Sequence, residues 1–164
     1  MEMVQARIVV PAHVDHLFYL ANHMAEDDRR ECEALGFGPL RALRRSLELS
    51  VFSWTGMLTP GMKPVCMWGL IPFGGLLSGQ AAPWFSSTDE LGRHRVFFVK
   101  RNRKFLRRML DLYPHLTDYV DVRHKRAIRW LKWLGFTVGP EIKTFGPNSM
   151  PFYKFEMKGD KCLH

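Results

Sequence analysis

The side chains best suited to chemistry in this sequence form two groups of opposite charge. The acidic group lies early in the chain and consists of Glu26, Asp27, Asp28, Glu31 and Glu33. A carboxylate can act as a general base, and a cluster of carboxylates attracts cationic molecules such as amines. The competing interpretation is a solvent-facing helix on which Asp27 and Glu31 form surface pairs with Arg30, and of the two we favour the surface pairs.

The basic group lies later and explains the overall charge of +8. Residues 93–132 hold 13 of the 24 lysines and arginines and only three acids, a net charge of +10, whereas the rest of the chain carries −2. Such a segment attracts phosphate-bearing partners, either a cofactor or nucleic acid. The alternative, which we favour for most of these residues, is a solvated helix face, because six basic residues at 100–108 lie opposite Phe98 and Phe105.

Several classes of protein are excluded. Cys32, Cys66 and Cys162 form no CxxC pair, and no histidine has a metal-ligand spacing, so we expect neither a metal site nor a disulfide framework. The first seven residues lack the pattern of a signal peptide, and the most apolar run, 65–77, is too short and too broken to cross a bilayer. The sequence therefore predicts an intracellular protein without membrane contact.

Hydrophobic periodicity over the 164 residues, of which 46% are hydrophobic, predicts one α/β (α+β) domain. Helices are expected over 12–35, 39–49, 96–113 and 125–134, and strands over 6–10, 50–58, 63–73, 82–88, 116–122, 137–145 and 152–158. This order, β-α-α-β-β-β-α-β-α-β-β, predicts a mixed central sheet of about six to seven strands with about four helices. The core spans about 6–158, and 159–164 form a short tail. Strands 82–88 and 116–122 should be parallel, because a helix connects them.

The segment 120–136 carries the most specific resemblance to a known family. His124 stands near a helix start, Ala127 follows three residues later, and Leu134-Gly135-Phe136 closes the helix. This segment, with the order of elements, resembles the GNAT superfamily of acetyl-CoA-dependent N-acetyltransferases. The stretches 25–31, 39–50 and 82–88 further resemble small GNAT-like proteins of tailed phages, some of which are internal virion or assembly proteins of short-tailed phages.

The resemblance implies acetyl-CoA as the cofactor and assigns residues to it. The strand residues would pair with the pantetheine arm, the turn residues would face the phosphates, and a histidine would lie near the cofactor mouth: Trp84, Phe85 and Ser86; Gly92, Arg93, His94 and Arg95; and His124. The family's phosphate turn carries a basic or amide residue and two small residues. Here Asp89 and His94 stand at two of these positions, so the match is partial.

The resemblance also implies where a base and an acid would lie. The first helical region of the family borders the acceptor site, which makes Glu31 the candidate base. The tyrosine that often serves as the acid is replaced by Leu131, so Tyr119 becomes the candidate acid, with Tyr153 as another option.

Three functions remain open from the sequence. The first is a phage-encoded N-acetyltransferase that acts on a protein or small-molecule amine in the cytoplasm of the infected bacterium. The second is a catalytically silent protein of the same fold that acts in virion assembly or binds a host or phage protein. The third and weaker one is nucleic-acid binding through the basic helix, which no recognised motif accompanies.

Overall fold

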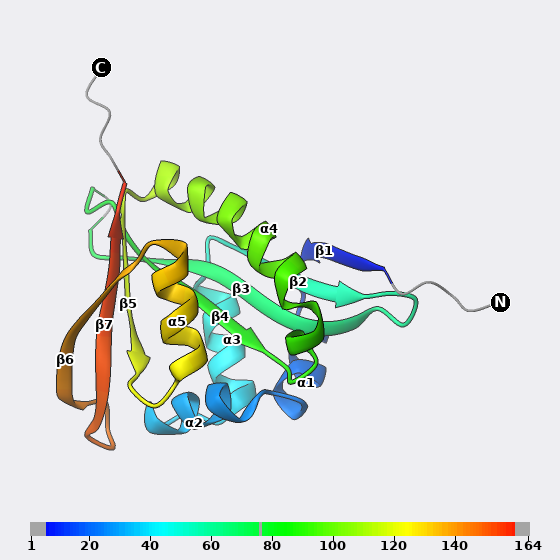
Figure 1. Cartoon of the computed structure of the whole chain (residues 1–164), viewed down its shortest axis with the longest axis horizontal. Helices are drawn as coiled ribbons and strands as arrows, with labels where there is room; N and C mark the ends of the chain where they lie inside the picture. The colour runs from blue at the N-terminus through cyan, green and yellow to red at the C-terminus, as the bar shows by residue number, and fades with distance from the viewer. Residues whose placement is uncertain (1–5, 76, 160–164) are drawn as a thin grey trace.

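Seven strands form one mixed sheet in the order β1-β2-β3-β4-β5-β7-β6 (Figure 1). The computed structural model of the chain describes residues 6–75 and 77–159; the N-terminal residues 1–5, the tail residues 160–164 and Cys162 lie outside them. The strands are β1 (Arg7–Pro11), β2 (Phe52–Leu58), β3 (Lys63–Phe73), β4 (Gln80–Ser87), β5 (His115–Asp121), β6 (Thr137–Phe145) and β7 (Met150–Lys158). The helices are α1 (Asp15–Asn22), α2 (Glu26–Ala34), α3 (Pro39–Leu49), α4 (Leu91–Leu112) and α5 (Lys125–Leu134).

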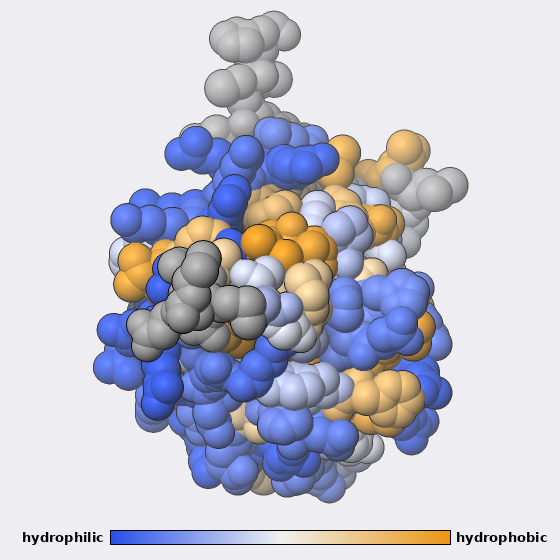
Figure 2. Space-filling model, turned by 90° about the vertical axis from the view of Figure 1, so that its right-hand side faces the viewer, coloured by the Kyte–Doolittle hydropathy of each residue, from blue (hydrophilic) through white to orange (hydrophobic). Residues whose placement is uncertain are grey.

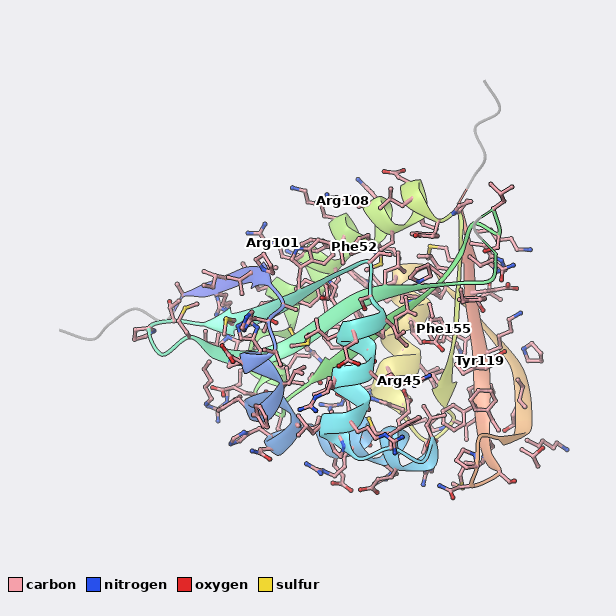
Figure 3. The ribbon with its side chains drawn as sticks, turned by 180° about the vertical axis from the view of Figure 1, so that it is seen from behind. Arg45, Phe52, Arg101, Arg108, Tyr119 and Phe155 are labelled. Atoms are coloured by element: carbon pink, nitrogen blue, oxygen red, sulfur yellow. The ribbon has the colours of Figure 1, made fainter. Side chains whose placement is uncertain are left out.

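Helices cover both faces of the sheet and bury a separate hydrophobic cluster on each. Helices α4 and α5 lie on one face, where Phe98 and Leu131 belong to a cluster that includes Trp68 and Leu116 of the sheet. Helices α1–α3 lie on the other face (Figures 1 and 3), where Leu17, Leu20 and Leu43 pack with Met67 of β3. The predicted mixed α/β domain is therefore confirmed.

The number of helices differs from the expected four. The single helix predicted over 12–35 is two helices, because the chain leaves the helical path between them. Met24 forms a β-bridge with Thr88, and the amide of Ala25 donates to the carbonyl of Ser87 at 2.8 Å. These contacts are distant in sequence, so helical periodicity cannot reveal them. They place the start of α2 against the end of β4.

The strand pair expected to be parallel is confirmed, and its two members diverge. Strands β4 and β5 pair only at Gln80–His115 and Ala81–Leu116. Pro83 of β4 has no N–H to donate, which disfavours continued pairing. Beyond Ala81, a gap therefore opens between the main chains of β4 and β5. The connecting helix α4 begins at Leu91, earlier than the predicted residue 96.

Gly56 provides a test of how tightly β2, β3 and α4 pack. A Cβ atom at Gly56 would lie 2.5 Å from Cε1 of Phe98 and 2.7 Å from Sγ of Cys66. We expect Gly56→Ala to lower the free energy of unfolding by about 1–3 kcal/mol, because a buried methyl group would displace two packed side chains. Urea unfolding measures this, with Gly61→Ala as the control, since a Cβ there meets nothing within 4 Å. Equal stability of the two variants would contradict the packing.

Candidate functional site at the diverging strands

The hydrogen-bond pattern of β4 decides which of its residues face the gap. The amide of Thr88 donates to the carbonyl of Val65 at 2.9 Å, so alternate residues from Thr88 backwards are bonded to β3. The intervening residues, Ser87 and Phe85, therefore direct their main-chain groups toward β5. Since β5 has already diverged at this point, the N–H and C=O of Phe85 face the gap without a strand partner.

Helix α2 inserts Asp28 at the wide end of the gap on the β4 side. Oδ2 of Asp28 accepts from the amide of Ser87 at 2.7 Å and from its hydroxyl at 2.9 Å. Oδ1 of Asp28 lies 2.7 Å from Nε2 of His124. One carboxylate thus connects the end of β4 to the start of α5.

On the β5 side of the gap, Glu31 of α2 likewise accepts a hydrogen bond from a main-chain amide. Its Oε2 accepts from the amide of Asp121 at 3.0 Å. Asp28 and Glu31 are three residues apart, so both project from one face of α2. A small part of Glu31 reaches solvent, but its carboxyl group is buried, and this burial raises the pKa of Glu31 to about 7. The carboxyl therefore titrates near neutral pH.

A further carboxyl, that of Asp118, lies on the inner edge of β5. The amide of His115 donates to Gly79, so odd-numbered residues of β5 direct their N–H groups toward β4. One of these, Tyr119, donates its N–H to Oδ1 of Asp118 at 2.8 Å. The carboxyl of Asp118 therefore lies at the gap, and burial raises its pKa to about 7.

His124 and Arg123 compensate part of this negative charge. His124 is buried at the N-terminus of α5, where its Nδ1 accepts from the amide of Ala127 at 3.4 Å. Burial by itself lowers the pKa of His124, but the hydrogen bond and charge of Asp28 outweigh it and raise the pKa above its usual value. Arg123 binds both carboxylate oxygens of Asp121. Burial raises the pKa of Asp121, but these contacts with Arg123 outweigh burial and lower it overall.

The three strand residues predicted to bind the cofactor are not equivalent. The main chains of Trp84 and Ser86 bond to β3, and the indole of Trp84 donates to Oγ of Ser50 at 2.8 Å on the α3 side. Only Phe85 directs its main chain into the gap. Its ring packs against Trp130 of α5, with centroids 4.7 Å apart.

The predicted phosphate-facing residues occupy the first turns of α4. Arg93 and Arg95 are exposed, and a Cβ at Gly92 would meet nothing within 4 Å. His94 is buried and accepts from Nε of Arg7 at 3.0 Å, so its ring contacts β1. Burial, with the nearby Arg7, lowers the pKa of His94. Glu90, an acid at this turn, is paired with Lys63 at 2.5 Å.

Tyr119, the predicted acid, lies away from β4. Its ring packs against Phe145 of β6, with centroids 4.4 Å apart, and it lies toward the β6–β7 side of the sheet (Figure 3). The structure therefore brings Glu31, His124 and the main chain of Phe85 to one region, and it does not bring the ring of Tyr119 there.

The basic residues of α4 form an exposed face. They are Lys100, Arg101, Arg103, Lys104, Arg107 and Arg108, of which Arg101 and Arg108 are labelled in Figure 3. Two of them also contact aromatic rings: Arg101 lies over Phe97 and Arg103 over Trp133. Their exposure agrees with the solvated face that the sequence favoured.

Sequence reasoning did not single out Ser87 or Asp118 as residues at the gap, and it did not predict that Asp28 would bond to both Ser87 and His124. Asp28 was one of five candidate carboxylates, and its i,i+3 spacing to Glu31 was the available signal. Asp118 and Ser87 carried no such signal, because the direction of their main-chain and side-chain groups depends on strand register.

Elsewhere, the described residues show a hollow of about 590 Å³ near α1 and the β2–β3 turn, lined by residues that include Tyr19, Met57 and Lys63. Figure 2 shows the side of the molecule that lies on the right in Figure 1, near β1. This side is mostly hydrophilic and carries small separate hydrophobic groups. A second hollow, of about 520 Å³, lies between α5 and β6–β7. Within residues 6–75 and 77–159, no group of three or more His, Cys, Asp or Glu side chains could hold a metal ion. In the same residues, no helix is long and apolar enough to span a membrane.

Several solved structures with this fold are described as acetyltransferases, although their sequences are distant. A proposed acetyltransferase from Acinetobacter baylyi superposes with a TM-score of 0.74 at 11% identity, covering 99% of this chain and 98% of that one. The ribosomal-protein-S5-alanine acetyltransferase from Vibrio fischeri gives 0.67 at 14% identity, covering 94% of each chain. A chimera of the spermidine N-acetyltransferase from Vibrio cholerae gives 0.66 at 10% identity, covering 93% of this chain and 95% of that one.

These similarities show that the chain has the GNAT fold. No family model and no curated protein matches the sequence itself.

Asp28 provides a test of the connection across the gap. In Asp28→Asn, His124 loses its charged partner, and we expect the free energy of unfolding at pH 6 to fall by about 3 kcal/mol. The raised pKa of His124 means that its ion pair contributes fully below its unfolded pKa and is lost as the pH rises through the folded value. The loss in stability should therefore be smaller at pH 9.

Chemical unfolding at the two pH values checks this difference. Asp27→Asn is the matched control, because its nearest cationic atoms are 3.8–4.0 Å away and its side chain is 30% exposed. We expect it to change stability by less than about 0.5 kcal/mol. A pH-independent effect of Asp28→Asn would contradict the ion pair.

Glu31 provides a second test, in which the substitution should raise the free energy of unfolding rather than lower it. A folded pKa above the unfolded value means that the carboxyl favours the native state only while it is protonated, and this contribution is lost as the pH rises through about 7. Glu31→Gln retains an oxygen that can accept from Asp121 and removes the ionisation. We expect it to raise the free energy of unfolding at pH 8.5 by about 1–3 kcal/mol, with no gain at pH 4. A loss of stability at pH 8.5 would show that the charged form is favoured.

Proposed function

We propose that this protein is an N-acetyltransferase that moves an acetyl group from acetyl-CoA to an amine. The observation that carries the proposal is the divergence of β4 and β5 with an ionisable carboxyl, Glu31, at its wide end. A gap between two strands leaves main-chain groups able to pair with an extended ligand, as a third strand would. A carboxyl with a pKa near 7 is suited to accept a proton at neutral pH.

The residues beside the gap fit an amide-containing arm such as pantetheine. The N–H and C=O of Phe85 face the gap, and Nε1 of Trp130, which packs on Phe85, is buried without a hydrogen-bond partner among the described residues. Buried polar groups without partners are uncommon in native proteins, so a ligand that accepts from Trp130 would satisfy one. When bound, acetyl-CoA supplies an acetyl group activated as a thioester.

The charges on the two sides of the gap fit two different ligands. Arg93 and Arg95, exposed in the first turns of α4, are available to phosphate groups near a helix N-terminus, which itself favours anions. Asp27, Asp28 and Glu31 of α2 favour a cationic amine. In this proposal, Glu31 accepts the proton that the amine loses as it attacks.

Two contacts must change for acetyl-CoA to enter. Asp28 occupies the amide of Ser87, the main-chain donor of β4 nearest to Glu31. Trp130 covers the ring of Phe85. We propose that α2 and the indole of Trp130 shift when the ligand binds, while the strands of the sheet keep their positions.

The acceptor is an amine on a protein or on a small molecule. The structural neighbours include a ribosomal-protein-S5-alanine acetyltransferase and a spermidine N-acetyltransferase chimera. Spermidine is a cationic amine, which the acidic face of α2 would attract.

A second candidate is supported by the contact between Asp28 and Ser87. A protein that has lost its chemistry would gain stability from a permanent bond at this position. The partial phosphate turn, with Asp89 and His94, supports the same alternative. Such a protein would be the phage-encoded assembly or host-binding protein that the sequence resemblance implies, acting in the cytoplasm of an infected bacterium.

Binding and turnover separate the two candidates. We expect calorimetry to detect acetyl-CoA binding by the wild type. We also expect the wild type to transfer the acetyl group to spermidine or to a peptide with an N-terminal alanine, and the release of the CoA thiol measures this transfer. Glu31→Gln should lower kcat by about 100-fold or more, because general base catalysis contributes 10²–10⁴-fold.

The control for this experiment is Glu33→Gln, an exposed position on the same helix. It should bind and turn over acetyl-CoA as the wild type does. If the wild type shows no binding at millimolar acetyl-CoA, the enzyme hypothesis is wrong and the silent candidate stands.

A further inference from the structure

Helices α4 and α5 expose ten basic side chains that have no role in the proposed transfer. Six belong to residues 100–108 of α4, and four are Lys125, Arg126, Arg129 and Lys132 of α5. The two helices contain one acid, Asp111. Within residues 6–75 and 77–159, only Arg126 of the ten has an acidic partner, Asp27 at 3.8 Å. We refer to these ten residues as the basic surface.

The two helices meet at this surface, so their charges act together. The guanidinium of Arg103 lies 3.8 Å from the ring centroid of Trp133, and its Nη2 donates to the carbonyl of Trp133 at 3.3 Å. Along α4, Lys100, Lys104 and Arg107 are spaced at i, i+4 and i+7 and therefore form one row. A long anion that follows this row reaches α5 at the contact between Arg103 and Trp133.

The charges of the protein are separated between the two sides of the sheet. The basic surface lies on the side of α4 and α5, whereas the carboxylates of α2 lie on the opposite side with α1 and α3 (Figures 1 and 3). A surface whose charges serve only solubility carries both signs interspersed. A surface of one sign attracts a polyanion and raises the rate at which it associates.

The ring of Trp133 favours nucleic acid over an acidic protein as this polyanion. Its side chain is 48% exposed among the basic residues, although a tryptophan gains more by burial. Unpaired bases stack on aromatic rings and on guanidinium planes, and the pair of Trp133 and Arg103 offers both. The carboxylates of an acidic protein have no use for such a stacking position.

A hollow on the other flank of α5 extends the basic surface. It has a volume of about 520 Å³, and its lining includes Lys125, Arg129 and Lys132 together with Tyr153 of β7 and Ile128. Arg129 and Trp133 are four residues apart and so are neighbours on α5. Cationic side chains beside aromatic rings are the combination that binds single strands, because the first contact phosphates and the second contact bases.

We propose that the basic surface binds single-stranded nucleic acid. The phosphates contact the basic residues of α4 and α5, and unpaired bases stack on Trp133 and enter the hollow beside Tyr153. Because this surface and the acidic face of α2 lie on opposite sides of the sheet, a nucleic acid and an amine acceptor can be bound at the same time. The inference does not depend on acetyl transfer.

Fluorescence anisotropy with a labelled single-stranded oligonucleotide tests the proposal on the full chain. We expect binding at low salt that weakens as salt is added, because contacted phosphates release their counterions. Lys104→Gln combined with Arg107→Gln removes two phosphate contacts. This double variant should bind about 10-fold more weakly, and its plot of log affinity against log salt concentration should be shallower by about 1.4.

Arg44→Gln combined with Arg45→Gln is the matched control. It removes the same charge from two exposed arginines of α3, on the opposite side of the sheet from α4 (Figure 3). We expect its affinity to stay within about twofold of the wild type, because the phosphates do not contact α3. An equal loss of affinity in the two double variants would overturn the proposal, since net charge alone would then explain binding.

Trp133→Ala tests the stacking position. It should weaken binding of the single strand about 10-fold without changing the salt dependence, and Trp133→Phe should retain most of the affinity. A duplex of the same sequence should bind more weakly than the single strand, because its bases are already paired and stacked. Circular dichroism checks that each variant is folded.

Three results would overturn the proposal. The first is no binding of the oligonucleotide by the wild type at low salt. The second is equal affinity for the single strand and the duplex with no effect of Trp133→Ala. The third is equally tight binding of poly-glutamate, which would identify an acidic protein as the partner. Each of these results leaves the proposed acetyl transfer as it stands.

Discussion

The structure depends on how the free edges of two diverging strands are satisfied. Strands β4 and β5 share two pairs of residues and then separate, which leaves main-chain donors without strand partners. Buried main-chain groups need hydrogen bonds, so an unsupported divergence would be costly. Helix α2 supplies the partners, because Asp28 binds Ser87 and Glu31 binds the amide of Asp121. The two carboxylates hold the strands at a fixed separation.

This solution creates the electrostatics of the site. Burying carboxylates is unfavourable unless cations or hydrogen bonds compensate, and the compensation here is uneven. Asp28 is bound to His124 and Asp121 to Arg123, whereas Glu31 and Asp118 have only main-chain donors among their hydrogen bonds. The pKa of each of these two is consequently raised to about 7. The contact of Glu31 that supports the edge of β5 therefore also leaves a carboxyl with a raised pKa at the gap.

The same constraint explains where the predicted elements and the structure differ. The helix expected over 12–35 is interrupted because Met24 and Ala25 bond to the end of β4, which brings Asp28 into position. The helix α4 begins earlier than its hydrophobic stripe indicated, so that His94 belongs to the helix and contacts Arg7 of β1. Trp84, Phe85 and Ser86 look alike in sequence as candidates for a strand edge, but only Phe85 faces the gap.

The sequence by itself determined the order of the strands, the α/β class and the parallel pair β4–β5, because periodicity and chain connectivity are local properties. It also offered Glu31 as a candidate base, with the resemblance as the guide, although it favoured surface pairs for the acidic segment. Only the tertiary structure decided which carboxyls lie at the gap and which of them have raised pKa values. Register and burial set those properties, and both arise from contacts between residues about 60 to 100 positions apart, such as Asp28 with Ser87 and His124.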